Sequence, residues 1–286
     1  MQFGMKLYDI KLFHIPNMRI LSMKLVSLLF ASTLLVAPTA SYAACSASAP
    51  PISWSSEKEA FPVSVPEDAK NMNPLAIVIF RHGEKPLRDD GLMIEDGNLG
   101  RDSISRLSHL PDSLLSQFGC PDLLVSANPA IKMLNKKSGL YFNYVRPLAT
   151  IEPLAQKIDF PVWTPYGYAQ NDFLARDLLG DPALRPAVDG KTKKVFISWE
   201  RNNIAKLLES LKTTGRLHAP AGEVLMADSV RYRCEEPKKW EQCDFDTILL
   251  VNIRDGAICI TPKSENLNSK SFLNRCKGAE STTDLS

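Results

Sequence analysis

Arg81, His82 and Gly83 have the residue types and the spacing needed for phosphoryl chemistry, and they directly follow the apolar run LAIVIF at residues 75–80. A histidine can attack phosphorus as a nucleophile and carry the phosphoryl group covalently. An arginine keeps its charge and offers planar N–H donors to phosphoryl oxygens, and glycine permits a tight turn. The alternative is a histidine at the end of a strand that only satisfies local hydrogen bonds.

Strands and helices must bring these side chains together in the folded chain. Short apolar runs rich in β-branched residues predict buried strands at 75–80, 123–127, 195–199 and 247–253. Apolar side chains recur at helical spacing in 103–118, 147–158 and 202–211. Strands that alternate with helices predict an α/β fold with a mainly parallel sheet. Ligands of such sheets bind beyond the carboxyl ends of the strands, which is where Arg81 and His82 stand.

Local signals add detail to these elements. Pro147 suits the first turn of the second helix, and Asn202 or Asn203 is expected to cap the third. Residues 254–256 read Arg-Asp-Gly and predict a turn that pairs 257–260 back onto the last strand. Residues 161–192 contain several prolines and glycines and are expected to form a loop or lid.

The N-terminal region has the features of a secretory signal peptide. The apolar run at 25–37 follows Lys24, and small residues lead to Ala43. The run is short for a bilayer span, and a buried core helix is the alternative. We expect 1–43 to be removed, with 1–22 as an upstream extension if the chain starts at Met23. The organisation is then an extended lead-in at 44–72, a folded domain at 73–286, and a periplasmic or secreted location without an integral membrane segment.

All six cysteines follow the predicted signal peptide, at positions 45, 120, 234, 243, 259 and 276. An even number in an exported chain predicts disulfides, although six cysteines allow 15 pairings. Cys234 with Cys243 would close a hairpin, and Cys259 with Cys276 would hold the C-terminal tail. A zinc site is less favoured because no CxxC pair is present. We therefore expect neither a metal nor a cofactor.

The charge balance excludes a generally basic, nucleic-acid-coating protein. The whole chain has 34 Lys and Arg against 32 Asp and Glu, and its formal net charge is +2. Residues 1–43 contain four basic residues and one acidic residue, so the remainder has a net charge near −1. No nucleic-acid partner is expected. Any affinity for phosphate must therefore come from a local group of cations.

The order of the motifs resembles the histidine phosphatase (phosphoglycerate mutase-like) superfamily, and more closely a bacterial exported group with RHGEKP and YVRPLATIEP motifs. The matching segments are 81–86, 97–99, 118–122, 128–129, 144–153, 199–200 and 244–246. The resemblance implies a three-layer phosphoglycerate mutase-like fold, with helices on both faces of a mainly parallel sheet. It also implies an exported enzyme that hydrolyses phosphate monoesters of small molecules.

The resemblance further implies roles for single residues. His82 would be the nucleophile, and Arg81 and Arg146 would bind the phosphoryl group. Arg146 also enters a predicted helix N-terminus, where the helix dipole and free amides favour an anion; its alternative is a surface ion pair with Glu152. Glu84 would protonate the leaving group. Its alternative is an ion pair with Lys85 or Arg88.

The chain departs from the family at its second histidine. The related pattern is W-E-H, whereas this chain reads Trp199-Glu200-Arg201. Arginine cannot transfer a proton, because it stays charged. It can stabilise phosphoryl charge, or slow turnover by binding the phosphoenzyme or phosphate too tightly. A catalytically inactive relative that binds phosphorylated ligands or a protein partner is therefore the second hypothesis.

Export disfavours a phosphoglycerate mutase, because it removes the protein from glycolytic substrates. His218, in a predicted loop, is a weaker candidate for the lost imidazole, and His109 is expected on a helix surface. Trp199 is expected in the core. Arg106 is expected at the rim of the site. The substrate and the oligomeric state stay open.

Overall fold

The computed structural model describes residues 45, 74–89, 92–135, 138–180, 192–220, 222–225, 230–236, 240–267, 274 and 276. The chain divides into two units, Met1–Ser41 and Tyr42–Ser286, and every described residue belongs to the second. The predicted signal peptide therefore lies outside the described residues, as does the predicted lead-in apart from Cys45. Within the described ranges, no helix has both the length and the apolar character needed to cross a bilayer.

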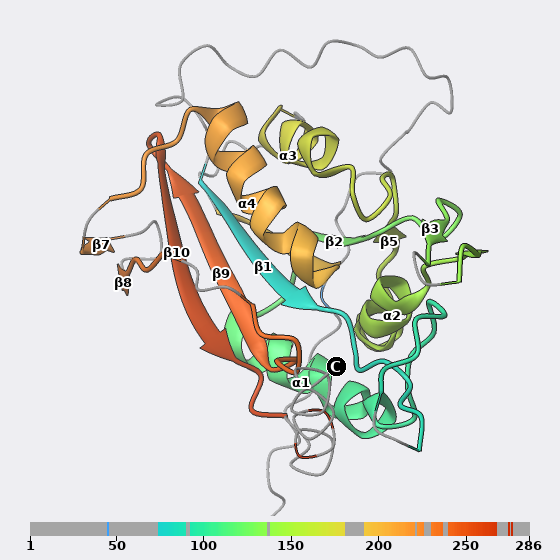
Figure 1. Ribbon diagram of the computed structural model, residues 1–286. Helices are drawn as coiled ribbons and strands as arrows, with labels where there is room; N and C mark the ends of the chain where they lie inside the picture. Colours follow the sequence, from blue (N-terminus) through green and yellow to red (C-terminus); the bar gives the residue numbers. More distant parts are fainter. Residues whose placement is uncertain are drawn as a thin grey trace, which may run out of the picture. The chain divides into compact units, whose positions relative to one another are not determined.

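A six-stranded sheet with the order β10-β9-β1-β6-β2-β5 forms the centre of this unit (Figure 1). Four strands run parallel to their neighbours: β1 (Leu75–Arg81), β6 (Lys193–Trp199), β2 (Leu123–Ser126) and β5 (Val162–Trp163). The other two, β9 (Thr247–Arg254) and β10 (Ala257–Ser264), form an antiparallel hairpin beside β1. All connections from the parallel strands to helices therefore leave at one edge of the sheet, the carboxyl edge.

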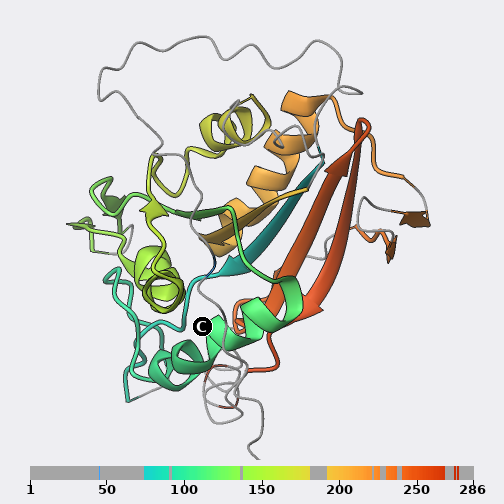
Figure 2. The ribbon, with the colours of Figure 1, turned by 180° about the vertical axis from the view of Figure 1, so that it is seen from behind.

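Helices cover both faces of the sheet (Figures 1 and 2). They are α1 (Ser103–Phe118), α2 (Arg146–Ile158), α3 (Asn171–Gly180) and α4 (Arg201–Gly215). Ile77 and Ile79 of β1 pack in one apolar cluster with α3 and α4. Val78 and Phe80, which alternate with them, pack in a second cluster with α1 and α2. This alternation along a strand buried on both sides gives the three layers. The predicted α/β fold is confirmed.

Two small antiparallel pairs complete the described elements. The strands β3 (Met133–Leu134) and β4 (Tyr141–Phe142) form the β3–β4 hairpin, which lies in the connection from β2 to α2. The strands β7 (Glu223–Leu225) and β8 (Arg231–Arg233) lie between α4 and β9 in the sequence. The β3–β4 hairpin is therefore part of the carboxyl edge.

The four predicted strands, the three predicted helices and the hairpin turn after β9 are confirmed. Two local predictions are wrong. Residue 200, not 202 or 203, caps α4: a Glu200 carboxylate oxygen accepts a hydrogen bond from the Asn203 amide at 2.9 Å. The expected loop at 161–192 contains β5 and α3, and only 181–191 of it lies outside the described residues. The prolines and glycines that flank α3 concealed its apolar face of Leu174, Leu178 and Leu179.

The predicted disulfides are present, but both suggested pairings are wrong. The structure joins Cys45 to Cys120, Cys234 to Cys259 and Cys243 to Cys276. Cys234 meets Cys259 because the chain after β8 runs beside β10, where the Glu235 amide donates to the carbonyl of Ile260. Closeness in the sequence therefore did not determine which cysteines form disulfides.

Candidate active site

The ends of β1 and β6 bring two segments together at the carboxyl edge. Arg81 is opposite Trp199 in the parallel register, and the amide of His82 donates to the Trp199 carbonyl at 3.1 Å. Trp199 itself is fully buried in the core, as expected. The residues that follow the two strands, His82 on one side and Glu200 and Arg201 on the other, therefore emerge next to each other.

His82 is a buried, neutral imidazole in a fixed orientation. Its side chain is only 1% exposed, and Nδ1 lies 2.7 Å from the carbonyl oxygen of Gly83. A carbonyl can only accept a hydrogen bond, so Nδ1 carries the hydrogen and Nε2 carries the lone pair. Burial and the positive charges of Arg146 and Arg81 hold the pKa of His82 well below its ordinary value of 6.5. Such an imidazole is a competent nucleophile at neutral pH.

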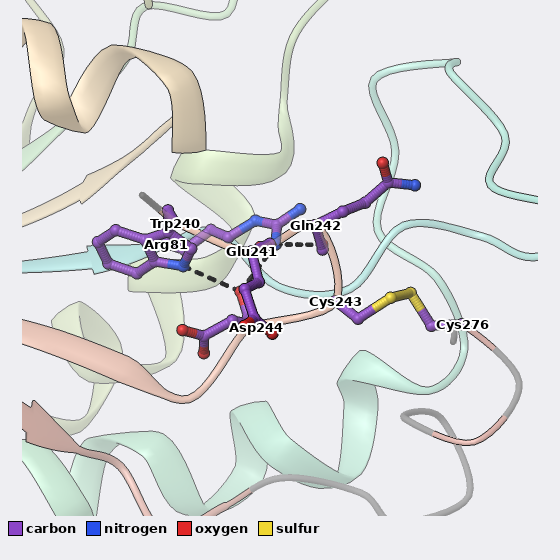
Figure 3. Close-up of a disulfide and its surroundings, with 7 residues drawn as sticks. All are labelled: Arg81, Trp240, Glu241, Gln242, Cys243, Asp244 and Cys276. Carbon is purple, nitrogen blue, oxygen red and sulfur yellow. Dashed lines mark hydrogen bonds between the residues drawn. A yellow bond between two sulfur atoms is a disulfide. The ribbon is translucent and has the colours of Figure 1, made fainter. Parts of the chain in front are cut away.

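Arg81 is held by the loop before β9. Its Nη1 donates to the carbonyl oxygens of Gln242 at 2.6 Å and Asp244 at 2.7 Å (Figure 3). Its guanidinium carbon lies 3.6 Å from the ring centre of Phe245, while Nε is buried without a hydrogen-bond partner. The disulfide of Cys243 holds the same loop (Figure 3). Carbonyl groups thus orient this arginine without neutralising its charge.

Arg201 follows the end of β6, where Trp199 lies opposite Arg81, and its positive charge acts on Arg81. Burial is the main reason that the pKa of Arg81 falls to about 9, and the positive charge of Arg201 is the next. Arg201 is the first residue of α4, directly after the Glu200 cap, and its side chain is partly exposed. The structure thus brings a third arginine to the cluster, at the sequence position where the related pattern has histidine.

Arg146 opens α2 and is 1% exposed. Its amide donates to the Gly97 carbonyl at 3.1 Å, and its Nη2 lies 3.3 Å from a carboxylate oxygen of Glu95. Its Nε and Nη1 are buried without hydrogen-bond partners. The predicted alternative of an ion pair with Glu152 is wrong, because Glu152 is exposed and accepts a hydrogen bond from Gln156.

A threonine connects Arg146 to the residue that follows His82. The Gly83 amide donates to Thr150 Oγ1 at 2.7 Å, and the same hydroxyl donates to the Arg146 carbonyl at 2.7 Å. A Cβ at position 83 would come within 2.9 Å of Cδ2 of Leu99 and 3.2 Å of Cβ of Ser103, so a larger residue there would have to displace these side chains. These two hydrogen bonds therefore fix the position of the segment after β1 relative to the first turn of α2.

Glu84 is buried beside Arg106, a residue of α1. One of its carboxylate oxygens lies 3.5 Å from Nη1 of Arg106, while Lys85 pairs with Glu95 instead. Burial raises the pKa of Glu84, and the charge of Arg106 partly opposes that rise. Arg106 was expected at the rim but is 2% exposed and makes two hydrogen bonds of 2.6 Å to Glu265. It faces inward because it lies on the same face of α1 as the buried Ser103 and Leu110, three residues before and four residues after it.

Sequence reasoning missed two residues of the cluster. Tyr144 is buried, with its ring 5.7 Å from that of His82 at an interplanar angle of 86°. The Arg146 guanidinium lies 5.1 Å from the Tyr144 ring, and burial raises the pKa of the phenol, so its hydroxyl stays protonated. Glu95 pairs with both Lys85 and Arg146. The YVRP motif already contains Tyr144, whereas no local signal distinguishes Glu95.

Glu95 has the opposite protonation tendency to Glu84. Partial burial would raise the pKa of Glu95, but the nearby charges and hydrogen bonds of Lys85 and Arg146 lower it below its ordinary value. Its side chain is 39% exposed. The surroundings therefore favour the ionised form of Glu95 at the rim, whereas burial makes ionisation of Glu84 harder than that of an exposed carboxyl group.

The other described histidines lie away from His82. The His218 amide donates to the carbonyl of Gly256, in the turn between β9 and β10. Ile253, near that turn, is opposite Leu75 at the start of β1, so His218 lies at the other edge of the sheet and cannot replace an imidazole beside His82. His109 is exposed on α1, as expected. Within the part of the chain that the structure describes, no group of three or more His, Cys, Asp or Glu is arranged to hold a metal.

Solved structures similar to this chain have low sequence identity to it. A phosphoglycerate mutase from Bacillus anthracis is 11% identical, with 73% of this chain and 99% of that chain covered and a TM-score of 0.38. A mycobacterial glucosyl-3-phosphoglycerate phosphatase is 12% identical, with 68% and 100% covered and a TM-score of 0.35. No family model matches the chain, and no curated protein is significantly similar to it.

Proposed function

We propose that the protein is an exported phosphomonoesterase that works through a phosphohistidine on His82. The main support is a set of buried, unpaired donors beside a neutral imidazole: Nε of Arg81 and both Nε and Nη1 of Arg146. A buried N–H group without a partner is costly, so natural proteins rarely keep three together without a ligand. A phosphoryl group supplies the acceptor oxygens that these donors lack.

The proposed reaction has two steps. Nε2 of His82 attacks phosphorus with its lone pair, the ester P–O bond breaks, and the leaving oxygen takes a proton from Glu84. Water then attacks the phosphohistidine, the P–N bond breaks, and the proton of the water passes to the Glu84 carboxylate. Inorganic phosphate leaves, and the starting state returns. The raised pKa of Glu84 supports its role as the acid.

The three arginines and the phenol act on the phosphoryl oxygens in this proposal. Arg81, Arg146 and Arg201 stabilise the charge that spreads over those oxygens in the transition state. The protonated Tyr144 hydroxyl donates a hydrogen bond, a contribution that a second histidine would otherwise make. Arg201 supplies charge at its position but no proton transfer.

The test is to measure phosphate release from soluble monoesters, including glycerol 3-phosphate, by the chain that begins at residue 44. We expect turnover, loss of at least about 10⁴-fold with His82→Ala, and little effect of His109→Ala, which removes an exposed imidazole. A rapid quench should trap an acid-labile, base-stable phosphoprotein in the wild type. Turnover that survives His82→Ala would exclude this mechanism.

Arg201 favours a second candidate function, a catalytically inactive protein that binds phosphorylated ligands. A third arginine strengthens an anion site while the imidazole of the related pattern is absent. Calorimetry with inorganic phosphate would then show binding in the absence of turnover. Arg201→His separates the two candidates, because a large gain in rate would mean that the native residue limits catalysis.

A further inference from the structure

Exposed apolar side chains gather at the carboxyl edge. Eight large apolar side chains of the described residues are exposed: Ile94, Ile104, Ile131, Leu134, Leu140, Tyr141, Phe173 and Val230. All except Val230 lie in or directly after the segments that leave β1, β2 and β5 at the carboxyl edge. Single exposed apolar residues are ordinary, but a concentration on one functional edge marks an interaction surface.

The β3–β4 hairpin and its flanks carry the most exposed part of this surface. Leu140 is 68% exposed, Tyr141 66% and Leu134 42%. The hairpin is joined to the catalytic cluster, because Asn135 Nδ2 donates to the backbone carbonyl of Glu95 at 3.0 Å. A ligand whose phosphate reaches Arg146 therefore has this apolar hairpin close to the rest of its structure.

The sequence segment that contains the β3–β4 hairpin has basic residues but no acidic ones. Between Asp122 and Glu152 the sequence has no acidic residue and four basic ones, Lys132, Lys136, Lys137 and Arg146. Arg146 is buried in the cluster, whereas Lys132 is exposed beside Ile131. Apolar side chains, a tyrosine and the exposed Lys132, in a sequence segment without acidic residues, match the composition that binds the interface of an anionic membrane.

We propose that the β3–β4 hairpin docks the site on an anionic lipid surface, and that the ester hydrolysed at His82 is the phosphate headgroup of a lipid. The second half rests on the proposed function, whereas the docking does not. The charge favours lipid over a second copy of this chain, because two copies of a segment without acidic residues would repel each other. The buried arginines would then bind the headgroup while Leu134, Leu140 and Tyr141 contact the acyl region.

The experiment separates docking from hydrolysis. Docking is measured by flotation with vesicles of phosphatidylcholine and phosphatidylglycerol, which contain no monoester. Hydrolysis is measured on phosphatidic acid in phosphatidylcholine vesicles and on glycerol 3-phosphate, the same headgroup without acyl chains. The test variant is Leu134→Ser/Leu140→Ser/Tyr141→Ser. The matched control is Val230→Ser, which alters an exposed apolar residue outside the carboxyl edge.

We expect the wild type and Val230→Ser to float with the vesicles and to prefer phosphatidic acid. In the triple variant, vesicle binding and the ratio of lipid to soluble turnover should each fall at least about tenfold. Absence of flotation in the wild type, or unchanged flotation of the triple variant, would overturn the docking. A dimer that the triple variant abolishes, without vesicle binding, would assign the surface to a second copy. Flotation without hydrolysis of either ester would support the docking and reject the phosphatase.

Discussion

Three buried arginines at the carboxyl edge have different surroundings, although each is 1–2% exposed: Arg81, Arg106 and Arg146. Arg106 places Nε and Nη2 each 2.6 Å from Glu265, and Nη1 lies 3.5 Å from Glu84. Arg146 contacts only one oxygen of the partly exposed Glu95, and Arg81 contacts carbonyl groups. Arg106 is therefore neutralised inside the protein, whereas much of the charge of the other two is not.

This difference separates an arginine whose charge is compensated from two whose donors are partly unpaired, and those two are the proposed phosphate ligands. A buried charge is tolerated when a carboxylate in good geometry compensates it, as Glu265 does for Arg106. Nη1 of Arg106 likewise makes no hydrogen bond, but it lies 3.5 Å from a carboxylate oxygen of Glu84. The donors that Arg81 and Arg146 leave unpaired lack that compensation. The unpaired state is expected to lower the stability of the ligand-free protein and to raise its affinity for an anion.

The largest effect should be the loss of stability when Arg106, the arginine with a compensated charge, is removed. Arg106→Ala leaves the carboxylates of Glu84 and Glu265 buried without their cation, and the free energy of unfolding should fall by about 3–5 kcal/mol. Denaturant titration measures the loss. The variant Arg106→Met/Glu265→Leu, which removes both charges, should recover most of it. An equal loss in the single and double variants would mean that the Arg106–Glu265 ion pair does not account for the change in the free energy of unfolding.

Next in size is the effect of the ligand-side arginines on activity. Arg146→Ala should lower kcat/KM by about 10²–10³-fold, because donors to the transition state are lost. The free energy of unfolding should stay the same or rise, since an uncompensated charge disappears. Arg101→Ala, which removes an exposed cation near the start of α1, is the control. A marked loss of stability in Arg146→Ala would mean that Arg146, like Arg106, stabilises the folded protein.

Inorganic phosphate should stabilise the wild type by about 2.7 kcal/mol at a concentration 100 times Kd. Phosphate supplies acceptors to the donors that Arg81 and Arg146 leave unpaired. Thermal unfolding with phosphate, and with chloride at equal ionic strength, measures the difference. Arg146→Ala should lose most of the stabilisation. Equal stabilisation of both proteins would indicate that phosphate binds elsewhere.

The smallest effect is a pH dependence that originates at His82. Its native pKa is lowered well below 6.5 by burial and by the charges of Arg146 and Arg81, so the unfolded chain takes up the proton first as the pH falls. The stability of the wild type relative to His82→Asn should be constant above pH 6.5. Below that it should fall by about 1.4 kcal/mol per pH unit until the native imidazole titrates.

Urea titrations of the two proteins between pH 5 and 8 measure this dependence. His109→Asn is the control, because an exposed imidazole titrates alike in both states and should leave the slope unchanged. A constant difference between wild type and His82→Asn over the whole range would mean that His82 is not held neutral.

The order of strands and helices was readable from the sequence because it depends on local patterns. A continuous apolar run rich in β-branched residues identified β1, and apolar residues at helical spacing identified α1. The position of Arg81 at the end of β1, and of His82 directly after it, then placed both residues at the carboxyl edge. The YVRP motif placed Arg146 at the start of α2. These features are properties of short segments, so neighbours in sequence were sufficient to predict them.

The partners of the charged side chains and cysteines were decided only by the tertiary structure. Arg106 meets Glu265, 159 residues away, and Cys243 meets Cys276 across a loop and a strand pair. Contacts of this kind form because the sheet order brings distant segments together, and no local pattern encodes that order. The exposure of Leu140 and Tyr141 has the same origin, since their apolar types alone predict burial. The sequence determined which groups could do the chemistry, and packing decided which of their charges were compensated.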